Sequence, residues 1–170
     1  MEDWYGMAQS WVPPESWTRV CAIDAHTEGE PLRVVLSGFS DLEGATVLER
    51  RRWACEHSDE LRRALMWEPR GHADMYGCIV MPPVTPLADL SVLFMHNSGF
   101  STMCGHGIIG VTTVLVECGL VPILDSVVEL GIDTPAGFVC ARADVDSTGS
   151  VSRVRFENVT SYTERLDATV

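Results

Sequence analysis

The segment from Asn97 to Gly119, NSGFSTMCGHGIIGVTTVLVECG, runs from a glycine-rich loop directly into a predicted helix. Its apolar residues, from Ile108 to Val116, surround nearly the whole circumference of that helix. A helix that is apolar on every side is buried, and Gly119 is a typical C-terminal stop. We therefore expect one buried helix at the centre of the domain.

Strand-like segments flank this helix on both sides. Residues 45–66 have a loose apolar stripe and an Asp59–Arg63 pair at i,i+4 spacing, which predict one helix. The segment HTEGE (26–30) is a polar loop of moderate length between two strands that form a hairpin. The predicted strands are 19–24, 32–37, 78–81, 91–96, 127–132, 138–143 and 151–156. The expected fold class is α+β, with a mixed sheet rolled around one buried central helix.

Residues 1–17 contain Trp, Pro and Ser without periodicity, so we expect a loosely ordered lead-in, followed by one domain at 18–170. The N-terminus lacks the basic and apolar regions of a signal peptide. No apolar run approaches the roughly 20 residues of a membrane span. The expectation is a cytoplasmic protein with reduced thiols and no membrane partner.

The composition excludes several classes of function. Hydrophobic residues make up 46% of the chain and charged residues 21%, a globular balance rather than a disordered one. The 24 acidic and 12 basic residues give a net charge of −12, which argues against nucleic acid as a partner. Every basic residue is Arg, so lysine Schiff-base chemistry is excluded within this sequence.

Cys104 lies in the segment Met-Cys-Gly-His-Gly at the start of the buried helix. The positive end of a helix dipole favours a thiolate, so we expect its pKa to fall below the ordinary value of about 8.5. Gly105 and Gly107 leave the backbone amides open, and these amides could hold a carboxylate. The remaining cysteines in apolar runs are interpreted as small buried hydrophobes: Cys21, Cys78, Cys118 and Cys140.

Other polar residues allow more than one interpretation. His106 could act as a base, a ligand donor or a simple helix cap, and Tyr76 could line a pocket or pack in the core. His26, His72 and His96 have no HxxxH or HExxH spacing, so we expect no metal site. A helix-terminal thiol suits either acyl transfer or proton abstraction next to a carboxylate, and the second is mildly favoured.

Four segments together resemble the proline racemase family, over the chain from about Val20 onward. They are DAHTEGEPLRVV (24–35), EPRGHADMYG (68–77), HNSGFSTMCGHGIIG (96–110) and DTPAG (133–137). The family includes proline racemase, 4-hydroxyproline epimerase and trans-3-hydroxy-L-proline dehydratase. His96-Asn97, the segment GEPLR and Tyr76 look most like the dehydratases.

The resemblance implies a diaminopimelate epimerase-like domain and a small imino acid substrate, hydroxyproline or proline. It implies that Cys104 is the general base at Cα, that the Gly105 and His106 amides bind the substrate carboxylate, and that Tyr76 lies against the ring. It implies no metal or organic cofactor. The activity is then dehydration to pyrroline-2-carboxylate, with racemisation or epimerisation as the alternative. A catalytically inactive binding module is an alternative of another class.

Family members are longer enzymes of two similar domains, so the resemblance covers only the N-terminal half. We expect the 170-residue chain to be inactive alone. A C-terminal domain, or a second copy across a twofold axis, would supply the opposite wall of the site. We also expect an exposed apolar rim around Met75, Tyr76 and residues 99–105.

Overall fold

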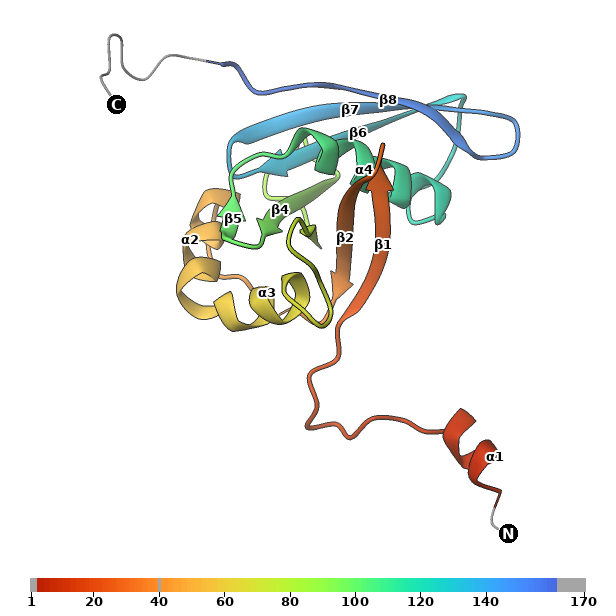
Figure 1. The fold of residues 1–170 in the computed structure, drawn as a ribbon. Helices are drawn as coiled ribbons and strands as arrows, with labels where there is room; N and C mark the ends of the chain where they lie inside the picture. The colour runs from red at the N-terminus through yellow and green to blue at the C-terminus, as the bar shows by residue number, and fades with distance from the viewer. Residues whose placement is uncertain (1–2, 40, 162–170) are drawn as a thin grey trace.

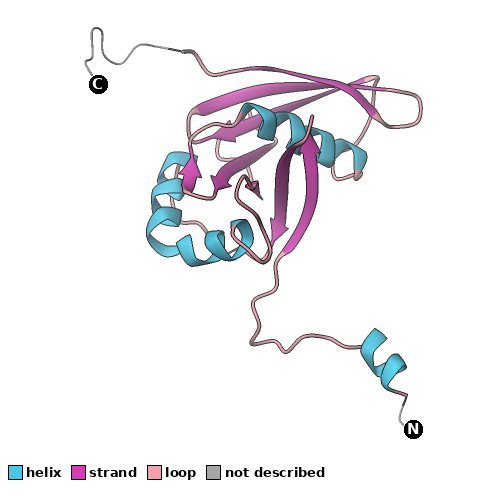
Figure 2. Cartoon of the chain, in the orientation of Figure 1, coloured by secondary structure: helices cyan, strands magenta, loops and turns pink. Residues whose placement is uncertain are grey.

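The computed structural model describes residues 3–39 and 41–161. Within these residues the strands are β1 (Cys21–Thr27), β2 (Glu30–Ser37), β3 (Tyr76–Met81), β4 (Leu90–His96), β5 (Gly99–Ser101), β6 (Val127–Thr134), β7 (Gly137–Val145) and β8 (Val151–Glu157). The helices are α1 (Trp4–Gln9), α2 (Val47–His57), α3 (Asp59–Met66) and α4 (Gly105–Glu117). Figures 1 and 2 show the sheet curving around α4, while α2 and α3 lie on its other side.

The strands form one mixed sheet in the order β1-β2-β3-β4-β6-β7-β8, with β5 paired to β4. The β2–β3 and β4–β6 pairs are parallel, and the other pairs are antiparallel. Helix α4 contacts strands from both halves of the sheet: β1, β2, β3, β7 and β8. The predicted α+β class, a mixed sheet rolled around one buried helix, is confirmed.

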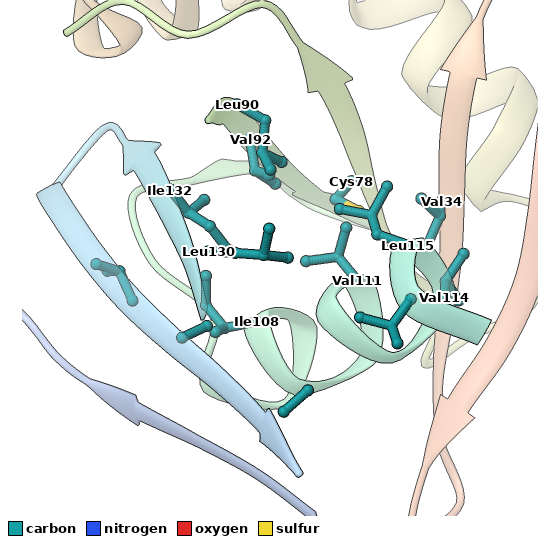
Figure 3. Close-up of a cluster of buried hydrophobic side chains, with 14 of the residues drawn as sticks. Val34, Cys78, Leu90, Val92, Ile108, Val111, Val114, Leu115, Leu130 and Ile132 are labelled. Carbon is teal, nitrogen blue, oxygen red and sulfur yellow. The ribbon is translucent and has the colours of Figure 1, made fainter. Parts of the chain in front are cut away.

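The main core lies between α4 and the concave face of the sheet, as Figure 3 shows for Ile108, Val111 and Leu115. Each such side chain contributes about 1.5–3 kcal/mol when fully buried. A second core lies on the opposite face, where α2 and α3 cover strands β2 to β4. Strand β4 serves both cores because successive side chains alternate, with Phe94 in the first and Met95 in the second.

The single helix expected at 45–66 is wrong, because the chain bends at Ser58. Ser58 has φ −127° and ψ 12°, outside the helical region, and it is the boundary between α2 and α3. Asp59 and Glu60 then occupy the first turn of α3, where acidic side chains favour a helix start. Asp59 accepts from Arg63 at 3.3 Å, so the predicted i,i+4 pair is confirmed.

The hairpin loop is also tighter than expected. Strands β1 and β2 continue to Thr27 and Glu30, and only Glu28 and Gly29 form the turn. Both turn residues have positive φ, 50° and 96°, the backbone geometry of a two-residue hairpin turn. The short strand β5 was missed, since three residues carry too little pattern to recognise.

The burial of the cysteines differs from the prediction. Cys78 is buried as expected, but Cys21 on the edge strand β1 and Cys118 after the end of α4 are exposed. Cys140 is only half-buried, on the outer face of β7. The predicted stop of α4 at Gly119 is confirmed: this residue has φ +66°, and its N–H donates to the Val116 carbonyl at 3.0 Å.

The predicted lead-in at 1–17 contains α1, a six-residue helix whose N-cap Asp3 accepts from the Gly6 N–H at 3.0 Å. This segment extends away from the sheet in Figure 1. Its tryptophans are 59–68% exposed: Trp4, Trp11 and Trp17. In the part of the chain described, no helix combines the length and apolar character needed to cross a bilayer.

Candidate active site

Cys104 is the N-cap residue of α4, with its side chain at the end of the main core. Its φ of −149° and ψ of 110° are extended, so the helix begins immediately after it, at Gly105. The Cys104 carbonyl accepts the first helical bond, from the Ile108 N–H at 3.0 Å. The thiol therefore lies next to the unpaired amides of the first turn, as predicted.

The electrostatic expectation for this thiol is wrong in direction. Cys104 is only 8% exposed, and its burial raises the pKa of the thiol. The Gly107 backbone N–H lowers this pKa, while the negative charge of Glu30 raises it. Desolvation is the largest of the three effects and outweighs the helix terminus. Cys104 is therefore mostly protonated at neutral pH in this structure.

The two glycines around His106 have different roles. A Cβ on Gly107 would lie 2.7 Å from Phe94 and 3.1 Å from the Cys104 sulfur, so no larger residue fits there. A Cβ on Gly105 would meet only Phe156, at an ordinary 3.5 Å. Gly107 therefore packs the first turn of α4 against β4, and exposed Gly105 leaves its side open.

Three aromatic rings lead away from the thiol. His106 Nδ1 lies 3.4 Å from the Cys104 sulfur. The His106 ring stands edge-on to Tyr76, with centroids 4.8 Å apart, and Tyr76 contacts His96 at 5.7 Å. Tyr76 and His96 are also paired across strands β3 and β4. The structure thus brings together all four predicted site residues: Cys104, Gly105, His106 and Tyr76.

The β1–β2 turn reaches the same place, and sequence reasoning assigned it no role there. The Thr27 hydroxyl donates to the His106 carbonyl at 3.0 Å and fixes the first turn of α4 to β1. Glu30, across the turn, is close enough to affect the pKa of Cys104. The sequence signal that could have indicated a role for Glu30 was its position in the polar segment HTEGE (26–30).

The DTPAG segment also borders the site. The Ala136 N–H donates to the Thr102 carbonyl at 3.2 Å, which ties the β6–β7 turn to the loop before Cys104. An open hollow of about 800 Å³ lies beside these two loops. Its lining residues are Leu48, Thr102, Met103, Pro135, Ala136, Asn158, Val159, Thr160 and Ser161.

The exposed apolar rim is the expectation for this region that the structure contradicts. Met75 and Phe100 are buried, at 4% and 3% exposure, because both pack in the second core, so the exposed apolar rim is largely absent. His26, one of the three histidines for which no metal site was expected, accepts from the Gly29 N–H within its own turn. Among residues 3–39 and 41–161, no three His, Cys, Asp or Glu side chains gather as metal ligands.

The arrangement suits proton transfer next to a bound carboxylate. A sulfur base, a ring nitrogen and free helix-terminal amides lie together at one end of α4. The amides can hold an anion through their dipoles, and a thiolate beside them can remove a proton from the neighbouring carbon.

The sequence model of a protein family, described as proline racemase, matches residues 22–170 of this chain. A trans-3-hydroxy-L-proline dehydratase of Bacillus cereus is 51% identical over 148 residues, 87% of this chain and 44% of that protein. The dehydratase of Burkholderia ambifaria and a 3-hydroxyproline 2-epimerase of Burkholderia multivorans are each 47% identical, with the same coverage. The chain thus spans less than half the length of these curated relatives.

Solved structures agree in fold. A hydroxyproline epimerase from Agrobacterium vitis, with bound trans-4-hydroxy-L-proline, has a TM-score of 0.83 at 28% identity and covers 89% of this chain and 44% of that one. A probable proline racemase from Agrobacterium radiobacter, with bound carbonate, has a TM-score of 0.76 at 31% identity, covering 81% and 41%. The expected diaminopimelate epimerase-like fold is confirmed.

Proposed function

Because the chain belongs to the proline racemase family, we propose that it acts in cofactor-independent removal of the Cα proton from a proline-type imino acid. The reaction is dehydration of trans-3-hydroxy-L-proline, and residues 18–170 form the N-terminal catalytic domain, with 162–170 outside the described residues. The observation that carries this proposal is the Cys104 sulfur at the start of α4, 3.4 Å from His106.

The N-terminus of α4 holds the substrate carboxylate through the Gly105 and His106 amides. This contact withdraws charge from Cα and stabilises the carbanion that forms there. The ring of Tyr76 forms one side of the space for the substrate ring. Its edge-on contact with His106 supports that placement.

The thiolate form of Cys104, which burial makes the minor form at neutral pH, removes the Cα proton. The electron pair left at Cα forms the Cα–C3 double bond while the C3–O bond breaks, and the hydroxide leaves with a proton as water. The enamine then tautomerises to the cyclic imine pyrroline-2-carboxylate. No electrons are exchanged with a redox partner, so a base, a proton donor and a carboxylate site suffice.

Epimerisation at Cα is the second candidate. It is supported by the 3-hydroxyproline 2-epimerase at 47% identity and by the structural likeness to a hydroxyproline epimerase. The first step is the same proton removal by Cys104. The outcome differs only in whether a group on the opposite face returns a proton to Cα.

We propose that a C-terminal domain, rather than a second copy of this chain, supplies that opposite face. Met75 and Phe100 are buried, so little apolar surface is left for pairing through the predicted rim. The net charge of −12 on each copy also opposes self-association. Alone, the chain leaves the site open to water, which weakens its electrostatic contacts, so we expect negligible turnover.

The test is co-expression of the chain with the part of the Bacillus cereus relative that the match does not cover. The complex is given trans-3-hydroxy-L-proline, and the imine is reduced with borohydride and detected as proline. We expect proline from the complex, none from Cys104→Ala, and an unchanged rate from Cys118→Ala, whose side chain is exposed and far along α4.

The alternatives give different results in the same assay. Inversion of 4-hydroxyproline without imine formation would replace dehydration by epimerisation. Full activity of the Cys104→Ala complex would remove the thiol from the mechanism. A stable complex that neither dehydrates nor epimerises any proline derivative would favour a binding module.

A further inference from the structure

Arg62 in α3 is a charged side chain almost completely inside the protein, at 3% exposure. Its Nε donates to the Asp59 carboxylate at 2.7 Å, and Nη2 lies 2.7 Å from the same carboxylate. Its Nη1 donates to two backbone carbonyls, those of His96 and Asn97, each at 2.7 Å. Burying a guanidinium costs several kcal/mol of desolvation, and these contacts, which give each of its three nitrogens a partner, offset that cost.

Both carbonyls belong to the turn between β4 and β5, where His96 pairs with Gly99. Asn97, within the turn, adds two more contacts, because its Nδ2 donates to the Met66 and His72 carbonyls at 3.0 and 2.9 Å. The Trp67 indole N–H also donates to the Asn97 carbonyl, at 2.9 Å. Three side chains thus fix this turn: Arg62 in α3, Trp67 at the C-cap of α3, and Asn97 in the turn itself.

This turn carries the last ring of the series that leads to the thiol. His96 contacts Tyr76, Tyr76 stands against His106, and His106 lies beside the Cys104 sulfur. The turn therefore sets where the His96 ring contacts the Tyr76 ring. The position of Tyr76 in turn limits the position of the His106 ring. Arg62 contacts the backbone of His96 and reaches none of the reacting groups.

The positive charge of Arg62 also affects the pKa of His96. Burial lowers the pKa of His96, and the positive charges of Arg62 and then Arg51 lower it further. His96 accepts from the Ser98 N–H through Nδ1 at 3.1 Å, a bond that the neutral ring makes. A neutral His96 keeps an additional positive charge away from Tyr76.

We propose that Arg62, together with Asn97, is a positioning residue for the reaction, which holds the β4–β5 turn and thereby the ring series His96–Tyr76–His106 against Cys104. The role rests on the proposed function, since it concerns the geometry of that site. The same network also makes α3 part of the active-site support. In metal sites, groups that only orient a ligand change affinity or activity about 10- to 100-fold, and we expect an effect of that order here.

Arg63 is a matched control in the same helix turn. It also pairs with Asp59, at 3.3 Å, and lies over the Trp67 ring at 5.3 Å. Its side chain is 43% exposed, and among the described residues it donates no hydrogen bond to the turn. Arg62→Met and Arg63→Met thus each remove one positive charge from neighbouring positions. Only Arg62→Met also removes the bonds to the turn carbonyls.

The experiment has two readouts: proton NMR on the 170-residue chain, and thiol labelling on its complex with the part of the Bacillus cereus relative that the match does not cover, because the chain alone lacks one wall of the site. Proton NMR follows the ring signals of His96 and His106, which the Tyr76 ring current shifts. Iodoacetamide labelling with peptide mapping then measures how well pyrrole-2-carboxylate, a planar ring carboxylate, protects Cys104. We expect Arg62→Met to move both histidine signals and to weaken protection about 10-fold or more. Arg63→Met should leave both unchanged.

Two further variants keep the test decisive if Arg62→Met fails to fold. Arg62→Lys retains the charge but not the planar fork of donors, so we expect partial rescue. Asn97→Ala removes the other support of the turn while Arg62 remains, and should move the same two signals. If folded Arg62 variants keep wild-type histidine signals and protection, the positioning role is overturned.

Failure of the proposed function gives a different result. Pyrrole-2-carboxylate would then leave Cys104 of the wild-type complex unprotected at every concentration, while Arg62→Met would still move the His96 and His106 signals. That outcome would remove the imino acid site and keep the ordering of the rings by Arg62.

Discussion

The Cys104 sulfur and His106 Nδ1 are 3.4 Å apart, although the two residues are separated by only one glycine. The approach is possible because Cys104 is extended while the chain turns helical at Gly105. A neutral imidazole N–H at this distance stabilises the thiolate, and an unprotonated ring nitrogen stabilises the thiol. The tautomer of His106 therefore decides whether its ring supports the thiolate or the thiol of Cys104.

His106→Phe tests this link while keeping an aromatic ring in the space. The variant removes a hydrogen bond worth about 0.5–1.5 kcal/mol, so we expect Cys104 to be alkylated roughly 2- to 10-fold more slowly at pH 8. Iodoacetamide labelling with peptide mapping measures the rate, and Cys118 in the same sample serves as the internal reference. Equal or faster labelling of Cys104 would show that His106 does not support the thiolate.

The pH dependence of Cys104 labelling follows from its burial. Because desolvation raises the pKa of this thiol, little thiolate is present at neutral pH, and the labelling rate should still be rising above pH 8.5. We expect Cys104 to react more slowly than exposed Cys118 at pH 7. This reverses the expectation from the helix terminus alone. A Cys104 rate that is already at its plateau by pH 7 would contradict the role of burial.

The sequence predicted the centre of the fold well, because α4 combines an all-round apolar surface with a strong stop at Gly119. It predicted most strands within a few residues, since alternation and glycine turns mark them. It also selected Cys104, His106 and Tyr76, which the structure brings together. Local pattern and a distinctive motif were sufficient for these features.

What the sequence could not predict depends on contacts between distant residues. The raised pKa of Cys104 comes from desolvation by the surrounding fold, which the helix-terminus argument ignores. Arg62 lies within an ordinary charged helix pattern, and nothing in that pattern shows that its guanidinium reaches the carbonyl of His96. The break at Ser58 had weak local signals, because one helix and two give the same apolar stripe.

Buried thiols should also make the folded state sensitive to alkaline pH. Burial raises the pKa of Cys78 far above its ordinary value. The unfolded thiol loses its proton near pH 8.5 while the folded one keeps it, so this contribution is complete below that pH and declines above it. The free energy of unfolding then falls by about 1.4 kcal/mol per pH unit for each such thiol.

Cys78→Val is the variant that isolates this effect. It keeps an apolar side chain in the core and removes the ionisable group, so the decline between pH 8.5 and 10 should become shallower. Urea unfolding at a series of pH values measures the slope. Cys118→Ser, at an exposed position, is the control and should keep the wild-type slope. An unchanged slope in Cys78→Val would exclude this thiol as a cause.

The last prediction concerns a hydroxyl inside α4. Thr112 is fully buried, and among the described residues its Oγ1 has no hydrogen-bond partner. An unsatisfied buried hydroxyl costs about 1–3 kcal/mol, and valine has the same shape without that cost. We therefore expect Thr112→Val to increase the free energy of unfolding by about 1 kcal/mol, measured by urea unfolding at pH 7. Thr113→Val is the matched control, because the Thr113 hydroxyl donates to the Ile109 carbonyl at 2.9 Å and is partly exposed. Its replacement should be neutral or slightly destabilising. Equal effects of the two substitutions would mean that the gain comes from helix propensity or apolarity and not from the unpaired hydroxyl.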